Sequence, residues 1–385
     1  MKPAYRILHV ISGLHIGGAE MALHRLLSVM DREIFQSAVI SLTSDHPVGE
    51  MIRKIGVPVT SLGFKPGTLN PLLAVSLRKQ ILLNQPDLIQ TWMYHADLLG
   101  GLVSKTAGSP PVIWGIRHTV VDSKSLKRST YWVARASAFF SHYLPSKIIC
   151  NAEAGKDTHA RMGYDSNKMM VIGNGFDTGC FRPDSAARDS FRDELGVDQK
   201  TFLIGMGARF NPQKDHANFL SAAHLLRQKC PNVHFVLWGK DVDQHNQVLQ
   251  NLVRLMDMES YIHLLGLRMD GPRLFASLDV ASLSSAYGEA FPQVVGEAMA
   301  SGVPCVVTDV GDSAMLVSDT GKVVPPRDPV ALANAWMELL GLSPEERRSL
   351  GSKARQRIAD QYSLERMAES YSQLYRDIIA GAGTR

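Results

Sequence analysis

The segment YRILHVISGLHIGGAEMALHRLLSVM, residues 5–30, decides the fold of the first half of the chain. Its first eight residues are largely apolar and partly β-branched, which is typical of a buried strand. Residues 19–30 carry apolar side chains at helical spacing, so a helix is expected there. Between them, Gly17 and Gly18 would let the backbone approach a ligand closely. Strand, glycine turn and helix together predict the first unit of a doubly wound α/β domain.

The same alternation of strand and helix continues along the chain. Apolar, β-branched runs predict further strands at 36–42, 57–62, 87–92, 112–117, 147–151, 202–207, 233–238, 262–265, 280–284 and 304–308. Helical runs such as 216–229 and 244–256 lie between them, and residues after 329 are nearly all helical in pattern. Strands that alternate with helices favour parallel sheets covered by helices on both faces. The turn-rich stretch 173–196 is expected to be a linker between two such sheets.

Size and composition agree with two domains in a cytoplasmic protein. A chain of 385 residues is too long for one ordinary hydrophobic core. No run of 18 or more apolar residues is present, so no transmembrane helix is expected. The N-terminus lacks a cleavage-site pattern and is better interpreted as a strand than as a signal peptide. The four cysteines are scattered and form no CxxC pair, which predicts a reducing compartment.

Charge is distributed unevenly. Residues 1–177 hold 19 Lys/Arg and 12 Asp/Glu, a net charge of +7; the whole chain carries +4, so the remainder carries −3. Residues 123–152 contain no acid, and their aromatic residues are interleaved with the cations Lys124, Lys127, Arg128, Arg135 and Lys147. Nucleic acid is a conceivable partner, but an anionic membrane surface fits a basic, aromatic segment without a nucleic-acid fold better. An ordinary core helix with a basic outer face stays an equal alternative.

The stretch GEAFPQVVGEAMASGVP, residues 288–304, predicts an anion site at the start of a helix. Pro292 suits a first helical turn and Gly302 the position just past a helix end, so the helix is expected at 292–301. Its unpaired first-turn N–H groups would bind a phosphate. Glu289 could accept hydrogen bonds from hydroxyls beside that phosphate, and Glu297 could reach a further diol. A phosphate between two hydroxyl-rich groups describes a nucleotide sugar; two surface charges at a helix end are the alternative.

A second candidate site follows the strand expected at 202–207. The loop ARFNPQKDH places Arg209 and Lys214 after that strand, where two cations would neutralise a diphosphate. The alternative is a solvated basic loop. The cations and the 292–301 helix belong to the same edge of one predicted domain, which favours a shared ligand.

Two further stretches supply candidates in the first domain. His118, in WGIRHTVVD, could donate to a substrate hydroxyl or share in proton transfer, although a structural histidine is the more ordinary interpretation. Trp92, Tyr94 and His95, in QTWMYHAD, follow another predicted strand. They could line an acceptor pocket, or they could simply pack.

Cofactor and metal sites are not expected. The glycine turn lacks the GxGxxG pattern, and no acidic residue follows the second strand where a dinucleotide ribose would need one. Asp241 and Asp243 form a DxD sequence, but no supporting carboxylate is near them in the sequence. We therefore predict neither a nicotinamide cofactor nor a metal.

Taken together, these residues resemble the family 4 retaining glycosyltransferases, closest to bacterial enzymes of O-antigen and surface-polysaccharide synthesis. The resemblance spans nearly the whole chain and is carried by HVISGLHIGGAE, PDLIQTWMYHADLLGGL, VIWGIRHT, VIGNGFDTGCF, GARFNPQKDH, EAFPQVVGEAMASGVPCVVTDVGD and YSLERMAESYSQLYRDII. It implies the GT-B fold, in which two Rossmann-like domains face each other across a cleft. The acceptor-side domain would comprise residues 1–177 and a returning C-terminal helix at 363–385. Residues 178–362 would bind the nucleotide sugar.

The resemblance also implies roles for individual residues. Gly17 and Gly18 would approach the donor diphosphate, and Arg209 with Lys214 would hold it. The motif of Glu289, Ala290, Phe291 and Pro292 would contact the donor sugar, with Glu289 supporting the reacting centre. Glu297 would hold the ribose, and His118 would lie beside the sugar.

The implied reaction is metal-independent transfer of a sugar, with retention, from a nucleotide-diphosphate sugar to a hydroxyl of a lipid-linked glycan. UDP is favoured over GDP as the nucleotide. The enzyme would be cytoplasmic, or peripheral at the inner face of the cytoplasmic membrane. A nucleotide-sugar 2-epimerase-like isomerase and a non-catalytic subunit of a transferase complex are the alternatives.

Overall fold

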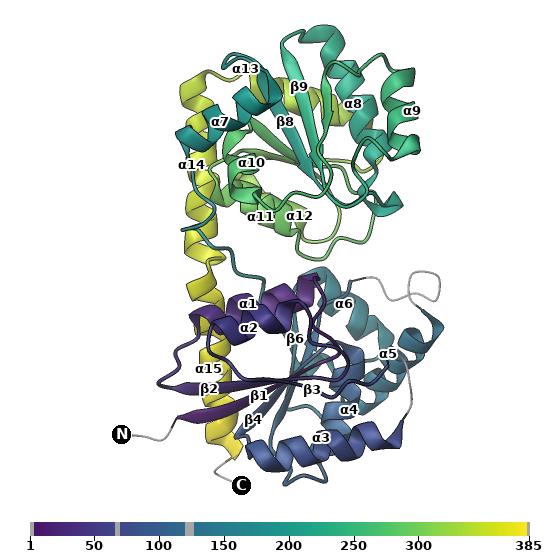
Figure 1. The fold of residues 1–385 in the computed structure, drawn as a ribbon, viewed down its shortest axis with the longest axis vertical. Coiled ribbons are helices and arrows are strands. Elements are labelled where there is room, and N and C mark those ends of the chain that lie inside the picture. The colour runs from purple at the N-terminus through teal and green to yellow at the C-terminus, as the bar shows by residue number, and fades with distance from the viewer. Residues whose placement is uncertain (1–3, 66–69, 120–126, 383–385) are drawn as a thin grey trace. The chain divides into compact units, whose positions relative to one another are not determined.

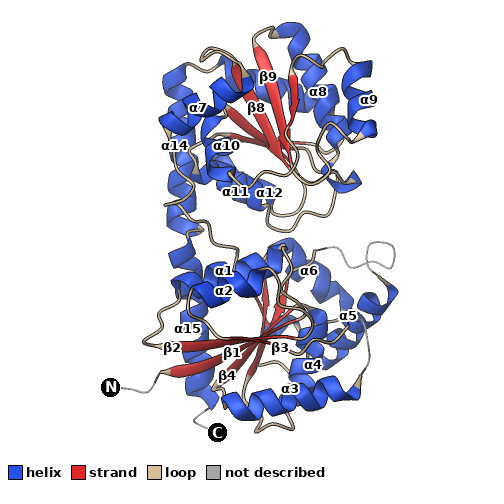
Figure 2. Cartoon of the chain, in the orientation of Figure 1, coloured by secondary structure: helices blue, strands red, loops and turns tan. Residues whose placement is uncertain are grey.

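The computed structural model describes residues 4–65, 70–119 and 127–382, and the chain divides into two compact units. Unit 1 comprises Met1–Gly175 together with Leu364–Arg385, and unit 2 comprises Phe176–Ser363. The boundaries expected from the sequence lie within two residues of these. Each unit is a sheet covered by helices on both faces (Figure 2).

Unit 1 is built on a seven-stranded parallel sheet with the order β3-β2-β1-β4-β5-β6-β7 (Figure 1). Its strands are β1 (Tyr5–Ile11), β2 (Phe35–Ser41), β3 (Val59–Ser61), β4 (Leu88–Trp92), β5 (Val112–Ile116), β6 (Lys147–Cys150) and β7 (Met169–Val171). The chain runs outward from β1 to β3 and then crosses back to β4. In such sheets ligands bind beyond the carboxyl ends of the strands where the order reverses, which here is between β1 and β4.

Alternate residues of the unit 1 strands point into two separate cores. Ile7 and Ile11 pack on one face with α1 and α15, whereas Leu8 and Val10 pack on the other with α3, α4 and α5. The helices are α1 (Gly18–Val29), α2 (Val48–Lys54), α3 (Pro71–Asn84), α4 (Tyr94–Ser104), α5 (Arg128–Phe140), α6 (Glu153–Met162) and α15 (Leu364–Ala382). Burial on both faces explains why the strands are continuous apolar runs in the sequence.

The last helix returns to unit 1, as the family resemblance implied. In α15, Tyr371 stacks on Trp92 with ring centroids 6.3 Å apart. Arg117 donates through Nη2 to the Tyr371 hydroxyl (2.7 Å) and through Nη1 to Asn174 (2.9 Å), and its guanidinium lies 4.5 Å from the Trp92 ring centroid. Arg117 therefore fastens β5 to a helix that is about 250 residues away in the sequence.

Unit 2 repeats the arrangement with a six-stranded parallel sheet of order β10-β9-β8-β11-β12-β13. Its strands are β8 (Phe202–Gly207), β9 (Val233–Trp238), β10 (Ile262–Leu264), β11 (Val280–Leu283), β12 (Cys305–Thr308) and β13 (Lys322–Val324). Its α-helices are α7 (Ser185–Leu195), α8 (His216–Lys229), α9 (Gln247–Leu255), α10 (Gly271–Ser277), α11 (Gln293–Ala300), α12 (Ser313–Val317), α13 (Pro329–Gly341) and α14 (Pro344–Gln361). Here the strand order reverses between β8 and β11.

The stretch 173–196 is not wholly a linker, because it contains helix α7. Asp184 caps this helix by accepting a hydrogen bond from the Ala187 N–H at 2.9 Å. Most of the helix surface is polar, so the turn residues before it dominated the sequence pattern. The three-residue strands β7 and β13 were also not predicted from the sequence.

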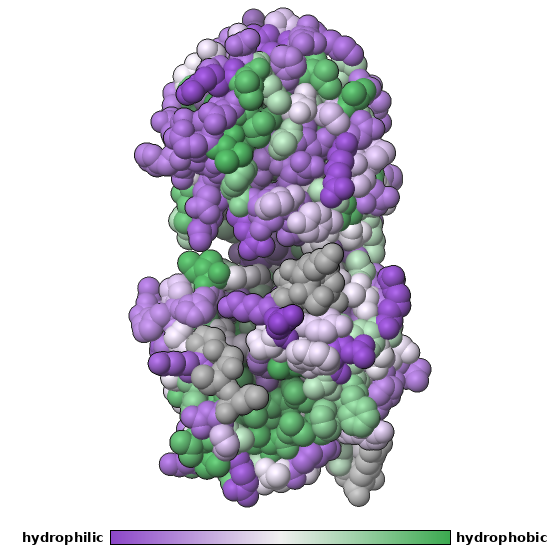
Figure 3. Space-filling model, turned by 90° about the vertical axis from the view of Figure 1, so that its right-hand side faces the viewer, coloured by the Kyte–Doolittle hydropathy of each residue, from purple (hydrophilic) through white to green (hydrophobic). Residues whose placement is uncertain are grey.

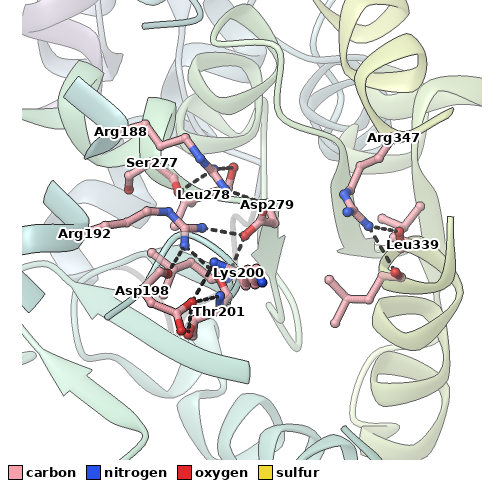
Figure 4. Close-up of polar contacts among 12 residues, drawn as sticks. Arg188, Arg192, Asp198, Lys200, Thr201, Ser277, Leu278, Asp279, Leu339 and Arg347 are labelled. Atoms are coloured by element: carbon pink, nitrogen blue, oxygen red, sulfur yellow. Dashed lines mark hydrogen bonds and ion pairs between the residues drawn. The ribbon is translucent and has the colours of Figure 1, made fainter. Parts of the chain in front are cut away.

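A buried charge network ties α7 to the amino end of the unit 2 sheet (Figure 4). Asp279 accepts hydrogen bonds from Arg188 Nη2 (2.9 Å), Arg192 Nη2 (2.7 Å) and the Leu203 N–H (2.9 Å). The Arg192 side chain is fully buried, and its Nη1 donates to the carbonyls of Asp198 and Thr201. The Asp279 carboxylate is thus held by two guanidinium donors and one backbone N–H.

None of the helices formed by the described residues is both long and apolar enough to span a membrane. The four cysteines all lie in the described part of the chain, and none of them forms a disulfide bond there. Burial raises the pKa of the Cys150 thiol to about 12, which favours an unreactive thiol.

Candidate active site

The candidate site in unit 2 lies at the carboxyl edge of its sheet, where the strand order reverses. Arg209 follows β8 by two residues, and Lys214 ends the short 3-10 helix Pro212–Lys214. Glu289 follows β11, the parallel neighbour of β8. Parallel neighbours end at the same edge, so residues about 75 positions apart in the sequence are brought together.

Lys214 and Glu289 form an ion pair across this edge. Lys214 Nζ donates to Glu289 Oε1, and the hydroxyl of Ser285 donates to the same oxygen. The Lys214 side chain is 16% exposed and that of Glu289 is 7% exposed. Since solvent screens a partly buried pair weakly, the two charges hold each other in a defined geometry. This contact brings together two of the residues that the sequence singled out.

Neighbouring hydrogen bonds fix the loops that carry the pair. Gln213 Nε2 donates to the Gly288 carbonyl at 2.8 Å, and the Ser284 hydroxyl donates to the Lys214 carbonyl at 2.9 Å. A side chain at Gly311, where φ is +59°, would place its Cβ 2.1 Å from the Glu289 carbonyl oxygen. Sequence reasoning missed these contributions. The only signal for them is the Ser284-Ser285 pair directly after a buried strand.

Helix α11 begins beside Glu289. The helix begins at Gln293, one residue later than predicted, and Pro292 is the residue just before it. Phe291 is buried and stacks on Phe176, with ring centroids 5.8 Å apart. The Phe291 side chain therefore anchors the helix start instead of facing a ligand. Glu297 is half-buried on the helix, past its first turn.

The DxD residues take part in local turn structure. The Asp243 carboxylate accepts from the His245 N–H at 2.8 Å, and the Asp241 carbonyl accepts from Asn246 Nδ2 at 2.7 Å. Within the described residues, no group of three or more His, Cys, Asp or Glu is arranged to hold a metal ion.

In unit 1, Gly17 and Gly18 start helix α1, and Gly17 is the residue before its first turn. A Cβ at Gly17 would lie 2.4 Å from Glu20 Oε2, but this oxygen is the end of a flexible side chain that can move aside, so packing does not demand glycine there. A Cβ at Gly18 would meet no described atom within 4 Å. Gly18 is therefore not required by packing, which leaves room for close approach of a ligand.

Of the four remaining candidates, His118 and Tyr94 stack on each other, and Trp92 packs in the other core of unit 1. His118 stacks on Tyr94 with ring centroids 5.4 Å apart, and burial lowers the pKa of His118, which favours the neutral imidazole at pH 7. Tyr94 is buried, and its hydroxyl pairs with His159 Nε2 at 2.7 Å. Trp92 is fully buried. The suggestion that Trp92 and Tyr94 line an acceptor pocket is thus wrong, because both pack in the core; His95 does line a cavity.

Comparison with known proteins decides the family. Residues 16–179 match the model of Glycosyltransferase Family 4, and residues 201–341 match that of Glycosyl transferases group 1. The chain belongs to the family 4 glycosyltransferases. The first match covers most of unit 1, and the second covers the part of unit 2 that holds Arg209, Lys214, Glu289 and Glu297.

Similar proteins are bacterial glycosyltransferases. The chain is 26% identical over 311 residues to the Escherichia coli UDP-Gal:alpha-D-GlcNAc-diphosphoundecaprenol alpha-1,3-galactosyltransferase. This alignment covers 79% of each of the two chains. It is 25% identical over 342 residues to the Campylobacter jejuni N,N'-diacetylbacillosaminyl-diphospho-undecaprenol alpha-1,3-N-acetylgalactosaminyltransferase, covering 86% of this chain and 88% of the relative. These relatives transfer sugars, so the isomerase alternative is not favoured.

Solved structures confirm the GT-B fold of this glycosyltransferase. Anabaena HepE in complex with UDP superposes with a TM-score of 0.85 at 21% identity, over 97% of this chain and 100% of that one. The lipopolysaccharide glycosyltransferase WaaG superposes with a TM-score of 0.72 at 15% identity, over 96% and 99% of the two chains.

Proposed function

We propose that this glycosyltransferase moves a sugar from a nucleotide-diphosphate donor to a hydroxyl of a lipid-linked glycan, with retention at the anomeric carbon. The proposal rests chiefly on one observation: a partly buried Lys214–Glu289 ion pair stands at the strand-order reversal of unit 2. Helix α11 starts immediately beside it. Ligands of doubly wound sheets bind at this place in the topology.

Charge explains why a diphosphate suits the unit 2 edge. A diphosphate leaving group gains negative charge as the bond to the sugar breaks, and fixed positive groups stabilise that charge. Arg209 and Lys214 supply two cations, and the first N–H groups of α11 supply the positive end of a helix dipole. Glu289 would accept hydrogen bonds from the donor sugar, and Glu297 from the ribose.

The transfer step needs no nucleophile from the protein. The bond between the anomeric carbon and the phosphate oxygen breaks, and the acceptor oxygen bonds to the same face of that carbon. The departing phosphate oxygen takes the proton of the acceptor hydroxyl, so protons and charges balance. His118 is favoured in its neutral form and would donate a hydrogen bond to the sugar.

The relatives support the choice of substrates. The names of the two bacterial relatives specify a diphosphoundecaprenol or diphospho-undecaprenol acceptor, and one also specifies UDP-Gal. HepE has been crystallised with UDP-glucose. We therefore propose a UDP-sugar donor before a GDP-sugar, and a polyprenyl-diphosphate-linked saccharide as the acceptor.

Donor choice is tested by thermal unfolding of the purified chain with UDP-, GDP- and ADP-sugars. A ligand that binds only the folded state raises Tm, so a UDP-sugar at 100 times its Kd should add about 2.7 kcal/mol to the free energy of unfolding. The same sample should transfer or slowly hydrolyse the sugar without a second protein. A larger shift with GDP-sugars would reassign the base, and binding without turnover would support a non-catalytic subunit.

Metal independence is tested with a chelator. Because protein cations take the role that a metal would have at the diphosphate, excess EDTA should leave the transfer rate unchanged within experimental error. The matched control adds Mn²⁺ or Mg²⁺ after EDTA, with no expected gain. A loss of rate that Mn²⁺ restores would instead assign a metal role to Asp241 and Asp243.

Membrane association is proposed for the basic segment that includes α5. Lys127 and Arg128 are exposed at its start, whereas Lys124 lies outside the described residues. Each basic residue near an anionic bilayer contributes about 1 kcal/mol. The double variant Lys127→Glu, Arg128→Glu should therefore bind phosphatidylglycerol vesicles at least ~10-fold more weakly in a sedimentation assay.

The control for this test is the double variant Arg348→Glu, Lys353→Glu, which reverses two exposed charges on α14 of unit 2. It should bind vesicles like the unchanged protein. Equal sedimentation of both double variants would remove the support for the proposed surface.

A further inference from the structure

Unit 1 contains a cavity of about 540 Å³ at the strand-order reversal of its own sheet. Ser12 follows β1 and Met93 follows β4, and both line the cavity. The remaining wall comes from the loops after β1, β2 and β3 and from helices α1, α3, α4 and α5. Its volume is within the range of roughly 300–1,000 Å³ that small-molecule sites occupy. The position and the size are therefore those of a ligand site.

The wall of this cavity is mainly apolar. Its apolar side chains include Leu42, Phe64, Leu73, Leu98, Trp132 and Val133. Sugars need polar partners around most of their hydroxyl groups, whereas here the polar side chains, among them Ser12, Thr43 and Ser129, share the wall with a larger apolar surface. An apolar ligand would instead be stabilised in proportion to the area that it removes from water.

The cavity opens beside exposed apolar side chains. Trp132 lines it and is still 67% exposed, and Leu72 and Val75 on α3 are 63% and 64% exposed. Figure 3 shows apolar atoms gathered on the side of unit 1 that carries α3 and α5. Contiguous apolar surface of this kind marks contact with another molecule. A chain longer than the cavity could thus continue across this surface.

The polar part of the wall can meet an anionic head group. Lys65 and His15 contribute basic side chains, His95 contributes an imidazole whose pKa is lowered by burial, and Glu20 is the one carboxylate among the described lining residues. Burial raises the pKa of Glu20, so this carboxylate takes up a proton more readily than an exposed glutamate does. An apolar chain with a phosphate-bearing end therefore matches both parts of the wall.

We propose that this cavity receives the isoprenoid units next to the diphosphate of the lipid-linked acceptor, and that Trp132 is a specificity-determining contact. The inference rests on the proposed function, because it places one part of that acceptor. It assigns Trp132, Leu98 and Ala136 to recognition of the lipid and Lys65 with His15 to its diphosphate. The saccharide would then extend from the same edge of the sheet.

Trp132 provides a direct measurement of occupancy. The other four tryptophans, Trp92, Trp114, Trp238 and Trp336, are at most 6% exposed, so acrylamide quenches chiefly the fluorescence of Trp132. Farnesyl diphosphate should protect this fluorescence from quenching and shift its emission to shorter wavelength. Inorganic diphosphate should do neither. Ala136→Phe, which fills the cavity and keeps the probe, should raise the Kd for farnesyl diphosphate at least ~10-fold, the effect of losing burial of about two methylene groups.

Phe139→Ala is the matched control, since Phe139 is a second exposed aromatic residue of α5 (63%) and does not line the cavity. It should leave the Kd unchanged. Absence of protection, equal protection by inorganic diphosphate, or an Ala136→Phe variant that binds normally would each overturn the proposal.

Kinetics separate this inference from the proposed function. Trp132→Ala should raise KM at least ~10-fold for an acceptor with a farnesyl-length chain, with kcat unchanged, because the lost contact is equally present in ground and transition states. KM for a short-alkyl acceptor should stay the same. Equal KM changes for both acceptors would overturn the lipid assignment. Absence of transfer to either acceptor by the unchanged protein would contradict the proposed function, while the fluorescence titration still decides the cavity's ligand.

Discussion

Replacing Lys214 by alanine should lower kcat/KM for sugar transfer at least ~10²-fold, and Glu289→Ala should do the same. In the proposed mechanism Lys214 stabilises the negative charge of the leaving diphosphate, and Glu289 orients both Lys214 and the donor sugar. Because the two side chains form one ion pair, they act as a unit. The double variant should therefore lose much less than the product of the two single effects.

Lys200→Ala is the control for Lys214→Ala. Lys200 is exposed and precedes β8, at the opposite edge of the sheet from Lys214. Its removal should leave transfer near normal. Circular dichroism and Tm should be recorded for every variant, since loss of one partner of a buried pair also destabilises the fold. Near-normal turnover in folded Lys214→Ala and Glu289→Ala would contradict the assigned site.

Asp279→Ala should lower the free energy of unfolding of unit 2 by about 3–5 kcal/mol. The substitution leaves the fully buried Arg192 guanidinium without its carboxylate and removes the acceptor of the Leu203 N–H. A shift of the urea midpoint, followed through the fluorescence of Trp238 and Trp336 in unit 2, measures the effect. Activity at low temperature should be retained, because Asp279 precedes β11 at the amino end of the sheet.

The matched control removes a carboxylate from an exposed ion pair. Glu345 pairs with Arg348 on the surface of α14, with 77% and 71% of the side chains exposed. Exposed pairs contribute little to stability, so Glu345→Ala should scarcely move the midpoint. If Asp279→Ala and Glu345→Ala unfold at the same urea concentration, the buried network does not stabilise unit 2.

Long elements of the fold could be predicted from the sequence. Helix α8 and strands β8 and β9 begin and end at the residues predicted from the sequence. Their bounds could be predicted because buried parallel strands form continuous apolar runs and helices repeat apolar residues at helical spacing. The three-residue strands β7 and β13 were missed, although β3 and β10, which are equally short, lie within predicted strands. Helix α7 was missed because Arg182-Pro183-Asp184 is equally suited to a turn and to a helix start.

For the candidate site, residue types could be predicted but not their partners. Lys214 and Glu289 stood out as charges at predicted strand ends, and the structure joins them. Ser285 lies only four residues before Glu289, but its donation to that carboxylate depends on the loop conformation, which the sequence pattern does not show. The Lys214–Glu289 contact joins two loops 75 residues apart in the sequence. Aromatic residues after a strand have the same pattern whether they face a ligand or the core. For Trp92 the core prevails because Tyr371, nearly 280 residues later, covers it.

The return of α15 to unit 1 has a consequence for synthesis on the ribosome. Unit 1 needs residues from both ends of the chain, and the side chains of α15 complete one of its two cores. Until position 364 and beyond have been translated, the apolar surface of α1 that α15 covers stays open to water and to other nascent chains. Unit 2 is continuous in sequence, so it can fold before the unit that precedes it is finished. Protection of the growing polypeptide by a chaperone is therefore expected to matter most for the N-terminal half.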